Sequence, residues 1–264
     1  MTTSIHTNTS AMIALQNLNR TNDQLASTQS RVNTGLKVQG AKDNAAVWAV
    51  AQGQRADRGS LEAVTTSLNR ATSIADVSLA AGEQISDILV ELKQKATAAA
   101  DPSATAAMRT SYNDEFQSLL SSIQSFADNA VFDGSNILDG TATTALNFLA
   151  SADASETISL DRQNLTLAGL SLTGTSLTSE ANATAALTAV NAAIATSSSR
   201  LAELGAQAKQ IERHTTYVGK LSDALEAGIG NLVDADMAKE SARLTALQVL
   251  SLIHISEPTR RTPI

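Results

Sequence analysis

The chain of 264 residues has an ordinary hydrophobic content of 43%, an aromatic content of only 3% and no Cys. This composition excludes wholesale disorder, disfavours a thick globular core built on aromatic rings, and excludes disulfides and thiolate metal sites. The formal net charge of −7 gives the chain no electrostatic attraction to nucleic acid or to an anionic membrane.

The beginning of the chain lacks the basic residues that open a secretory signal, because the first Lys or Arg is Arg20. The longest purely apolar run covers residues 45–51, which is far shorter than the ~20 residues needed to span a bilayer. We therefore expect a soluble protein that does not span a membrane and that, if exported, leaves without a cleaved signal peptide.

Residues 8–32 are predicted to form the first helix. Apolar residues recur there at alternating steps of four and three, which is the narrow stripe that one helix offers to another. This stripe consists of Ala11, Leu15, Leu18, Leu25 and Val32. A weakly amphipathic helix of this kind needs a partner to be stable in water. The alternative interpretation is an ordinary surface helix on a globular core.

After Gly35 and Gly40, the spacing predicts a second helix over about residues 41–99, with Gly53 and Gly59 as candidate break points. Its apolar stripe comprises Leu61, Val64, Leu68, Ala71, Ile74, Val77, Ala81, Ile85, Ile88 and Leu92. Asp101-Pro102 predicts the start of a third helix that ends near Asp128. Its inner face is predicted to hold Met108, Tyr112, Phe116, Leu119, Ile123 and Phe126.

The pattern changes at Val131. Two Asp-Gly pairs follow within residues 131–140, and Asp-Gly tolerates the positive φ of a tight turn, so this segment predicts a small hairpin. Residues 141–180 are rich in Ser, Thr and Leu, and two segments alternate as short half-buried strands do, at 157–160 and 165–167. We expect a compact β-containing insert rather than a domain.

Residues 181–227 carry the most regular pattern in the chain and predict a coiled-coil-like helix roughly 70 Å long. We assign its stripe to packing within one subunit; the positions are Leu187, Val190, Ile194, Leu201, Leu204, Ile211, Val218 and Leu225. Residues 228–231 are expected to break this helix. Another helix is predicted to open at Leu232, with acids in its first turn, and to continue through Leu244 and Leu247.

The fold is therefore predicted to be mainly α: a long antiparallel coiled-coil-like helical bundle with a small β-hairpin or β insert in the middle. We expect no catalytic, cofactor-binding or metal-binding residues and no enzyme. His6, His214 and His254 are far apart in sequence, and an EF-hand count from Asp234 fails because Thr245 occupies position twelve.

Motifs at both ends and in the middle, in their order and spacing over about residues 1–250, resemble the bacterial flagellin family, and are most similar to the short flagellins of alphaproteobacteria. At the front they are Asn8, Ala14-Leu15, Leu18, Leu25, residues 31–38 and residues 42–46. In the middle they are Phe132-Asp133-Gly134 through Leu138-Asp139-Gly140, and at the back residues 234–240 with Gln248.

This resemblance implies a structural subunit that polymerises into the extracellular flagellar filament and supports motility. The implied organisation begins with an N-terminal filament-core helix (1–40), the first half of a helical tube domain (41–140) and a short variable surface insert (141–180). The long C-terminal helix of the tube domain (181–227) and the start of the C-terminal filament-core helix (228–250) follow. The two core segments are expected to pair as a coiled coil lining the filament channel.

We expect six residues to form the apolar stripe for self-assembly: Leu15, Leu18, Leu25, Val32, Leu244 and Leu247. The resemblance further implies export through the flagellar type III apparatus with an export chaperone, and contacts with junction and cap proteins. Two other functions stay open: the hook–filament junction protein and, from another class, a non-flagellar coiled-coil adaptor.

The sequence departs from the family in two places. Aliphatic Ile88, Leu89 and Val90 precede Glu91-Leu92, where members recognised by the vertebrate innate flagellin receptor carry an Arg-rich pattern. We therefore expect weak or no receptor binding. Residues 251–264 hold two of the three Pro and abandon the apolar pattern. We expect this tail to be foreign sequence, similar to vector read-through, that truncates the last core helix.

Overall fold

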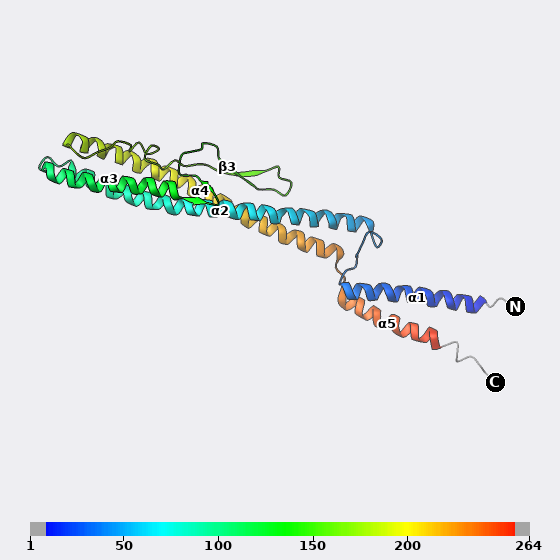
Figure 1. The fold of residues 1–264 in the computed structure, drawn as a ribbon. Helices are drawn as coiled ribbons and strands as arrows, with labels where there is room; N and C mark the ends of the chain where they lie inside the picture. Colours follow the sequence, from blue (N-terminus) through cyan, green and yellow to red (C-terminus); the bar gives the residue numbers. More distant parts are fainter. Residues whose placement is uncertain (1–8, 257–264) are drawn as a thin grey trace. The chain divides into compact units, whose positions relative to one another are not determined.

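The computed structural model describes residues 9–256 (Figure 1). The chain is mainly helical, as predicted, with five helices among these residues: α1 (Thr9–Thr34), α2 (Ala45–Ala99), α3 (Ala106–Asn129), α4 (Glu180–Val233) and α5 (Met237–Ser256). Four short strands lie between α3 and α4: β1 (Val131–Phe132), β2 (Ser135–Asn136), β3 (Leu146–Leu149) and β4 (Thr157–Leu160). Within this part of the chain, no helix is long and apolar enough to cross a membrane.

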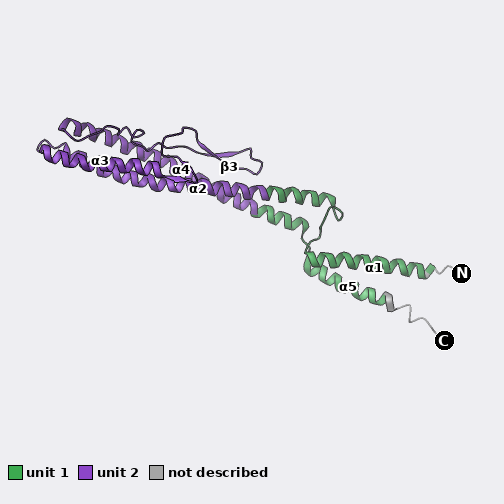
Figure 2. Cartoon of the chain, in the orientation of Figure 1, with its two compact units in different colours: residues 1–58, 223–264 green, residues 59–222 purple. Residues whose placement is uncertain are grey.

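The chain divides into two units (Figure 2): unit 1 consists of residues 1–58 and 223–264, and unit 2 of residues 59–222. In unit 2, parts of α2 and α4 run beside α3 (Figure 1). An ion pair between Arg109 and Glu180 at 3.8 Å joins α3 to α4, and Lys95 forms one with Glu115 that joins α2 to α3. Unit 2 is thus a bundle of long helices.

Apart from Ile74, which is also buried, the buried positions of α2 in unit 2 alternate strictly by three and four residues. They are Leu61, Val64, Leu68, Ala71, Ala75, Ser78, Gly82, Ile85, Leu89, Leu92, Ala96 and Ala99. After Ala71 the predicted stripe keeps the buried Ile74, Ile85 and Leu92. It also includes Val77, Ala81 and Ile88, which are only half-buried. The sequence prediction was wrong there because it avoided the two non-aliphatic positions, Ser78 and Gly82.

Both exceptions have a physical reason. The Ser78 hydroxyl donates a hydrogen bond to the Ile74 carbonyl at 2.8 Å, so the polar group is satisfied inside its own helix. Gly82 leaves room for Leu201 of α4 and for Leu165 of the insert. A Cβ at Gly82 would overlap the Leu201 side chain and lie 3.3 Å from Leu165 Cδ1. The missing side chain of Gly82 therefore allows close packing between the helices.

In α4, small residues occupy much of the buried face. Of the eight positions predicted to pack within the subunit, four are buried: Val190, Leu204, Ile211 and Val218. The other four are half-buried: Leu187, Ile194, Leu201 and Leu225. Ala186 and Ala193 are buried beside Leu187 and Ile194. The alanines allow a close approach, so the larger neighbours lie at the edge of the contact.

The start of α3 differs from the prediction. Thr105 is the N-cap and accepts a hydrogen bond from the Met108 amide at 3.3 Å. Asp101 instead closes a turn, because its carboxylate accepts hydrogen bonds from the amide and hydroxyl of Ser103, both at 2.8 Å. The Arg109 guanidinium, which donates to the Ala99 and Asp101 carbonyls, secures this connection.

The inner face of α3 is also rotated relative to the prediction. Its buried residues are Phe116, Leu120, Ile123 and Ala127. Met108 and Phe126 are exposed, contrary to expectation, and Tyr112 and Leu119 are half-buried. The prediction chose the largest apolar side chains for the inner face. In the structure, Leu120 and Ala127 are buried in place of the neighbouring Leu119 and Phe126.

The hairpin predicted at Asp133-Gly134 is confirmed. β1 and β2 pair antiparallel, and both turn residues have positive φ, 48° and 72°, as a type I′ turn requires. The strand predicted at 157–160 is β4, but it pairs with β3 and not with residues 165–167. Leu165 is fully buried in unit 2, and its amide donates to the Leu138 carbonyl at 2.9 Å.

In unit 1, the chain passes between helices through a small hydrogen-bonded crossing. Gly35 ends α1 with φ 71°, and its carbonyl accepts a hydrogen bond from the Ala235 amide at 2.8 Å. The Lys37 amide donates to the Val233 carbonyl at 2.6 Å. A buried cluster surrounds this crossing and consists of Val38, Ala51, Ile229 and Val233, with Leu36, Val47, Trp48 and Leu232 packed against it.

This cluster explains why the predicted glycine breaks do not occur. α4 continues through Gly228 and Gly230 to Val233, and α2 is unbroken at Gly53 and Gly59. Helical Gly costs ~1 kcal/mol each, which is less than the burial of Ile229 and Val233 returns. Consequently α5 begins at Met237 rather than Leu232.

Candidate assembly surface

The inner stripe of α1 faces α5. Thr21 and Thr28 are buried, whereas Leu18, Leu25 and Val32 are half-buried. The Thr21 hydroxyl donates to the Asn17 carbonyl at 2.9 Å, so this polar side chain satisfies its donor within α1. Asn22 and Gln29 continue the four-three spacing of the predicted stripe, but both are exposed, because Thr21 and Thr28 occupy the buried positions between the apolar residues.

The matching stripe of α5 includes Glu240, Leu244 and Leu247. Leu247 is buried and Leu244 half-buried. α1 and α5 run antiparallel: Arg31 contacts Glu240 near the start of α5, and the Ser251 hydroxyl donates to Asn22 Oδ1 at 3.4 Å further along. Five of the six residues predicted for self-assembly thus lie where α1 and α5 meet within one chain.

Leu15 is the sixth, and it lies outside this contact with 59% of its surface exposed. Further large apolar side chains are exposed on the first turns of α1 and on the last turns of α5. We call this set the distal apolar surface; it comprises Met12, Ile13, Leu15, Val249, Leu250, Leu252 and Ile253. Exposed apolar side chains at this density mark a surface that contacts a partner.

Sequence reasoning missed most of this surface because the residues lie beside the three-four ladder rather than on it. Met12 and Ile13 precede the inner-stripe residue Leu18 by six and five residues, which places them around the helix from that stripe. The usable signal was the local density of large apolar residues in a helix whose partner covers only one face.

An ion pair between the half-buried Arg31 and the buried Glu240 joins the two helices. Glu240 is 8% exposed, and its Oε1 lies 3.5 Å from Nη1 of Arg31. Its second oxygen, Oε2, is buried without a hydrogen-bond partner in the described structure. A buried charge is costly unless it is paired, so this contact favours one alignment of α1 against α5.

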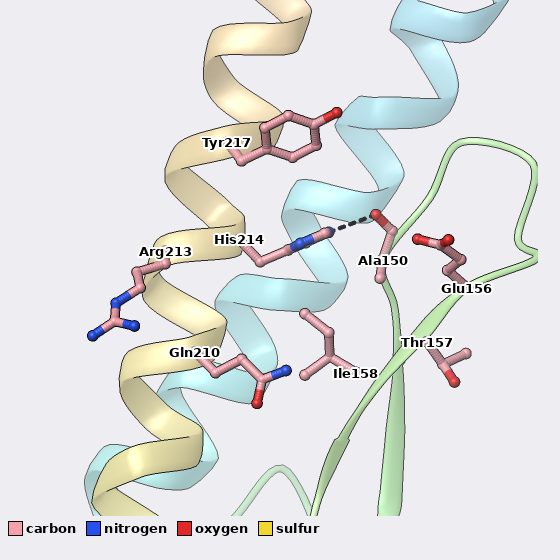
Figure 3. Close-up of a pocket in the computed structure, with 8 residues that line it drawn as sticks. All are labelled: Ala150, Glu156, Thr157, Ile158, Gln210, Arg213, His214 and Tyr217. Carbon is pink, nitrogen blue, oxygen red and sulfur yellow. Dashed lines mark hydrogen bonds between the residues drawn. The ribbon is translucent and has the colours of Figure 1, made fainter.

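A groove in unit 2 holds His214, one of the three histidines that the sequence singled out (Figure 3). Nε2 of His214 forms a 2.7 Å hydrogen bond with the Ala150 carbonyl. The centroids of the His214 and Tyr217 rings lie 5.8 Å apart. The ring thereby attaches the β3–β4 hairpin to α4. Among residues 9–256, no group of three or more His, Cys, Asp or Glu could hold a metal ion.

Comparison with known proteins assigns the family. The profile of the bacterial flagellin N-terminal helical region matches residues 5–143, and that of the bacterial flagellin C-terminal helical region matches residues 187–256. The chain belongs to the bacterial flagellin family. The N-terminal match covers α1 to α3 and the Asp133-Gly134 hairpin, and the C-terminal match covers most of α4 and all of α5.

This flagellin is similar to alphaproteobacterial flagellins in particular. It is 49% identical over 246 residues to flagellin FljM of Caulobacter vibrioides, covering 93% of this chain and 89% of that protein. It is 36% identical over 258 residues to a flagellin of Brucella melitensis, covering 93% and 90%. The C-terminal profile extends through Ser256, past the point at Ser251 where the sequence suggested a foreign tail.

Two solved structures share its fold. The crystal structure of Bacillus cereus flagellin matches with a TM-score of 0.53 and 25% identity, over 58% of this chain and 88% of that chain. A putative flagellar hook-associated protein from Vibrio parahaemolyticus matches with a TM-score of 0.60, over 73% of this chain and 100% of that chain, at 12% identity. The second likeness concerns the fold alone.

As a flagellin, the protein is a structural subunit and not an enzyme. It polymerises with its own copies into the filament of the bacterial flagellum, outside the cell, and so serves motility. The functional site to explain is therefore the surface by which one subunit contacts the next.

Proposed function

We propose that polymerisation of this flagellin uses the distal apolar surface as a contact between subunits. The inner stripes of α1 and α5, with Leu18, Leu25, Val32, Leu244 and Leu247, hold the two helices together within each subunit. The observation that carries this division is burial: Leu247 is 7% exposed, while Leu15 is 59% exposed.

The expected energy is sufficient for a polymer. Fully burying a large apolar side chain contributes roughly 1.5–3 kcal/mol, so covering one that is about half exposed contributes about 1 kcal/mol. The seven side chains of the distal apolar surface then supply several kcal/mol per subunit. A head-to-tail contact that does not close into a ring repeats indefinitely and gives an open filament.

Leu15→Asp tests this proposal. The substitution places a charge in the subunit contact, but its position is exposed in the single chain, so the monomer should keep its helical content by circular dichroism. We expect little or no polymer by sedimentation and electron microscopy. Gln16→Asp introduces the same charge at the next residue, which is also exposed, and serves as the matched control.

Leu18→Asp should behave differently, because Leu18 is half-buried on the inner stripe of α1. We expect it to loosen α1 from α5 in the monomer and therefore to lower helicity as well as assembly. Normal filaments from Leu15→Asp, or equal loss of filaments in Gln16→Asp, would contradict the proposed surface.

We further propose that the subunit is exported by the flagellar type III apparatus with an export chaperone, and that it contacts junction and cap proteins at the filament ends. The family supports this route. Secretion of the protein should stop in a strain that lacks the export apparatus, and secretion that continued there would contradict the route.

We propose weak or no binding to the innate flagellin receptor. In the segment before Glu91, Leu89 is buried and the exposed Val90 offers no guanidinium. Because an aliphatic side chain cannot replace the forked donors of Arg, receptor-bearing reporter cells should respond poorly to purified protein. Strong activation at low concentration would refute this expectation.

The hook–filament junction protein is the alternative function that the sequence left open. The relatives of this chain at 49% and 36% identity are flagellins, which favours the filament subunit over the junction protein. Antibody labelling distinguishes the two: a filament subunit is labelled along the whole length, and a junction protein only at the base.

We also propose that the tail from about Ser251 onward (251–264) is foreign to the natural reading frame. The supporting observation is compositional, since Pro258, Arg260, Arg261 and Pro263 interrupt the Leu-rich helix pattern. Resequencing the locus across codon 250 tests the proposal, and an unbroken natural frame that encodes these residues would refute it.

A further inference from the structure

A polar pocket of about 280 Å³ lies between α1 and α5 in unit 1. Three arginines line it, Arg20 and Arg31 from α1 and Arg243 from α5, together with a single acidic residue, Asp23. The other lining side chains are neutral and polar. A pocket with this lining is suited to an anion.

The helix geometry explains how the arginines gather. Arg20, Gln24, Ser27 and Arg31 follow one another at steps of four, three and four, so they form a single polar stripe along α1. On α5, Arg243 lies one turn after Glu240. Because Glu240 contacts Arg31, the antiparallel pairing brings Arg243 to the same side of the helix pair.

Two of the three guanidiniums are available. Arg31 uses Nη1 on Glu240 at 3.5 Å. The side chains of Arg20 and Arg243 form no hydrogen bond and no ion pair within residues 9–256, and both residues are exposed and line the pocket. Each guanidinium carries five N–H donors in a planar fork that matches the two oxygens of a carboxylate.

The distribution of charge along the chain indicates the source of that carboxylate. Unit 2 holds 17 acidic and 9 basic residues, whereas unit 1 holds 9 acidic and 10 basic residues. Copies of the chain therefore bring a large excess of carboxylates to the filament, all of it from unit 2. A neighbouring subunit is the partner that is always present at high local concentration.

We propose that this guanidinium pocket, formed by Arg20, Arg31 and Arg243, receives a carboxylate side chain from a neighbouring subunit in the filament. The inference rests on the self-association of the chain. It adds a charged contact to the apolar one, and this contact makes assembly depend on salt, because attraction between exposed charges is screened by ions.

The test compares two double variants of the full chain. Arg20→Gln/Arg243→Gln empties the pocket of its available charges. Lys42→Gln/Arg55→Gln removes the same number of charges from exposed positions of unit 1 outside the pocket and is the control. The measurement is the critical concentration for polymerisation, in buffer free of phosphate and sulfate, at low and at high concentration of sodium chloride.

We expect the pocket variant to raise the critical concentration about tenfold at low salt, as two exposed ion pairs would. The difference from the wild-type chain should shrink toward zero at about 0.5 M salt. The control should stay within about twofold of the wild-type chain, because surface charges away from a contact contribute little.

Three results would overturn the inference. Equal critical concentrations for the pocket variant and the control would remove the pocket from the contact. A loss of helicity in the monomeric pocket variant alone would assign the arginines to the fold of a single chain. Assembly of the wild-type chain only after addition of inorganic phosphate would make a free anion the occupant. A wild-type chain that never polymerises would instead refute the filament function, and the inference with it.

Discussion

Truncation of Leu89 tests the register in which α2 packs inside unit 2. Leu89 belongs to the buried three-four series and has no exposed surface, whereas its neighbour Ile88, which the apolar pattern selected, is half-buried. Leu89→Ala and Ile88→Ala remove side chains of equal carbon number from adjacent positions. The pair therefore compares the two registers directly.

The structure sets the expected magnitudes. Leu89→Ala removes three carbons from a site without solvent contact, which costs about 2.4 kcal/mol at ~0.8 kcal/mol per carbon. The cavity adds to this, so we expect a total of about 3 kcal/mol, within the usual 2–5 kcal/mol range. Ile88 is only half-buried, so Ile88→Ala loses part of the burial energy of the side chain, and Ala has a higher helix propensity than Ile. We therefore expect a destabilisation of about 1 kcal/mol or less.

Urea unfolding of the monomer, followed by circular dichroism at 222 nm, measures both values. In thermal unfolding, the same difference of about 2 kcal/mol corresponds to a separation of roughly 4–8 °C between the two variants. If Ile88→Ala destabilises the protein as much as Leu89→Ala or more, the register through Ser78 and Gly82 is wrong.

Three further predictions concern the hairpins and turns. Gly134→Ala should lower the free energy of unfolding in urea by about 1–2 kcal/mol, because φ at this residue is 72°, although an added Cβ would meet no other atom. Gly59→Ala is the control: its Cβ would also meet no other atom, but it lies inside α2, so the free energy of unfolding should stay the same or rise by up to about 1 kcal/mol. His214→Ala should speed amide exchange in the β3–β4 hairpin about fivefold, as loss of a hydrogen bond worth ~1 kcal/mol implies; unchanged exchange would exclude the anchoring role. Hydrogen bonds donated by Ser151 and, to a smaller extent, by Ser155 lower the pKa of Asp153 to about 2. The Asp153 carboxylate should therefore stabilise its turn fully above pH 4, and this stabilisation should be lost as the pH falls through 2. An ordinary carboxyl pKa for Asp153 in an NMR titration would contradict the prediction.

The sequence by itself determined the parts of this flagellin that depend on local chemistry. Helix spans followed from the spacing of apolar residues, with boundaries that differ from the structure by up to about six residues. The Asp133-Gly134 turn followed from its tolerance of positive φ. The family followed from motifs whose order and spacing need no tertiary information. Each of these features is decided by residues close together in the chain.

Only the tertiary structure decided which face of each helix is buried. Ser78, Gly82 and Ala193 lie inside the bundle because a partner helix approaches closely there, and no apolar count could select them over Val77, Ala81 or Ile194. The partner of β4 and the continuation of α4 through Gly228 were likewise set by distant residues. Packing between segments far apart in sequence outweighs local propensities of about 1 kcal/mol. The distal apolar surface could therefore be identified only from the structure, in which α1 and α5 are paired and the side chains that stay exposed are known.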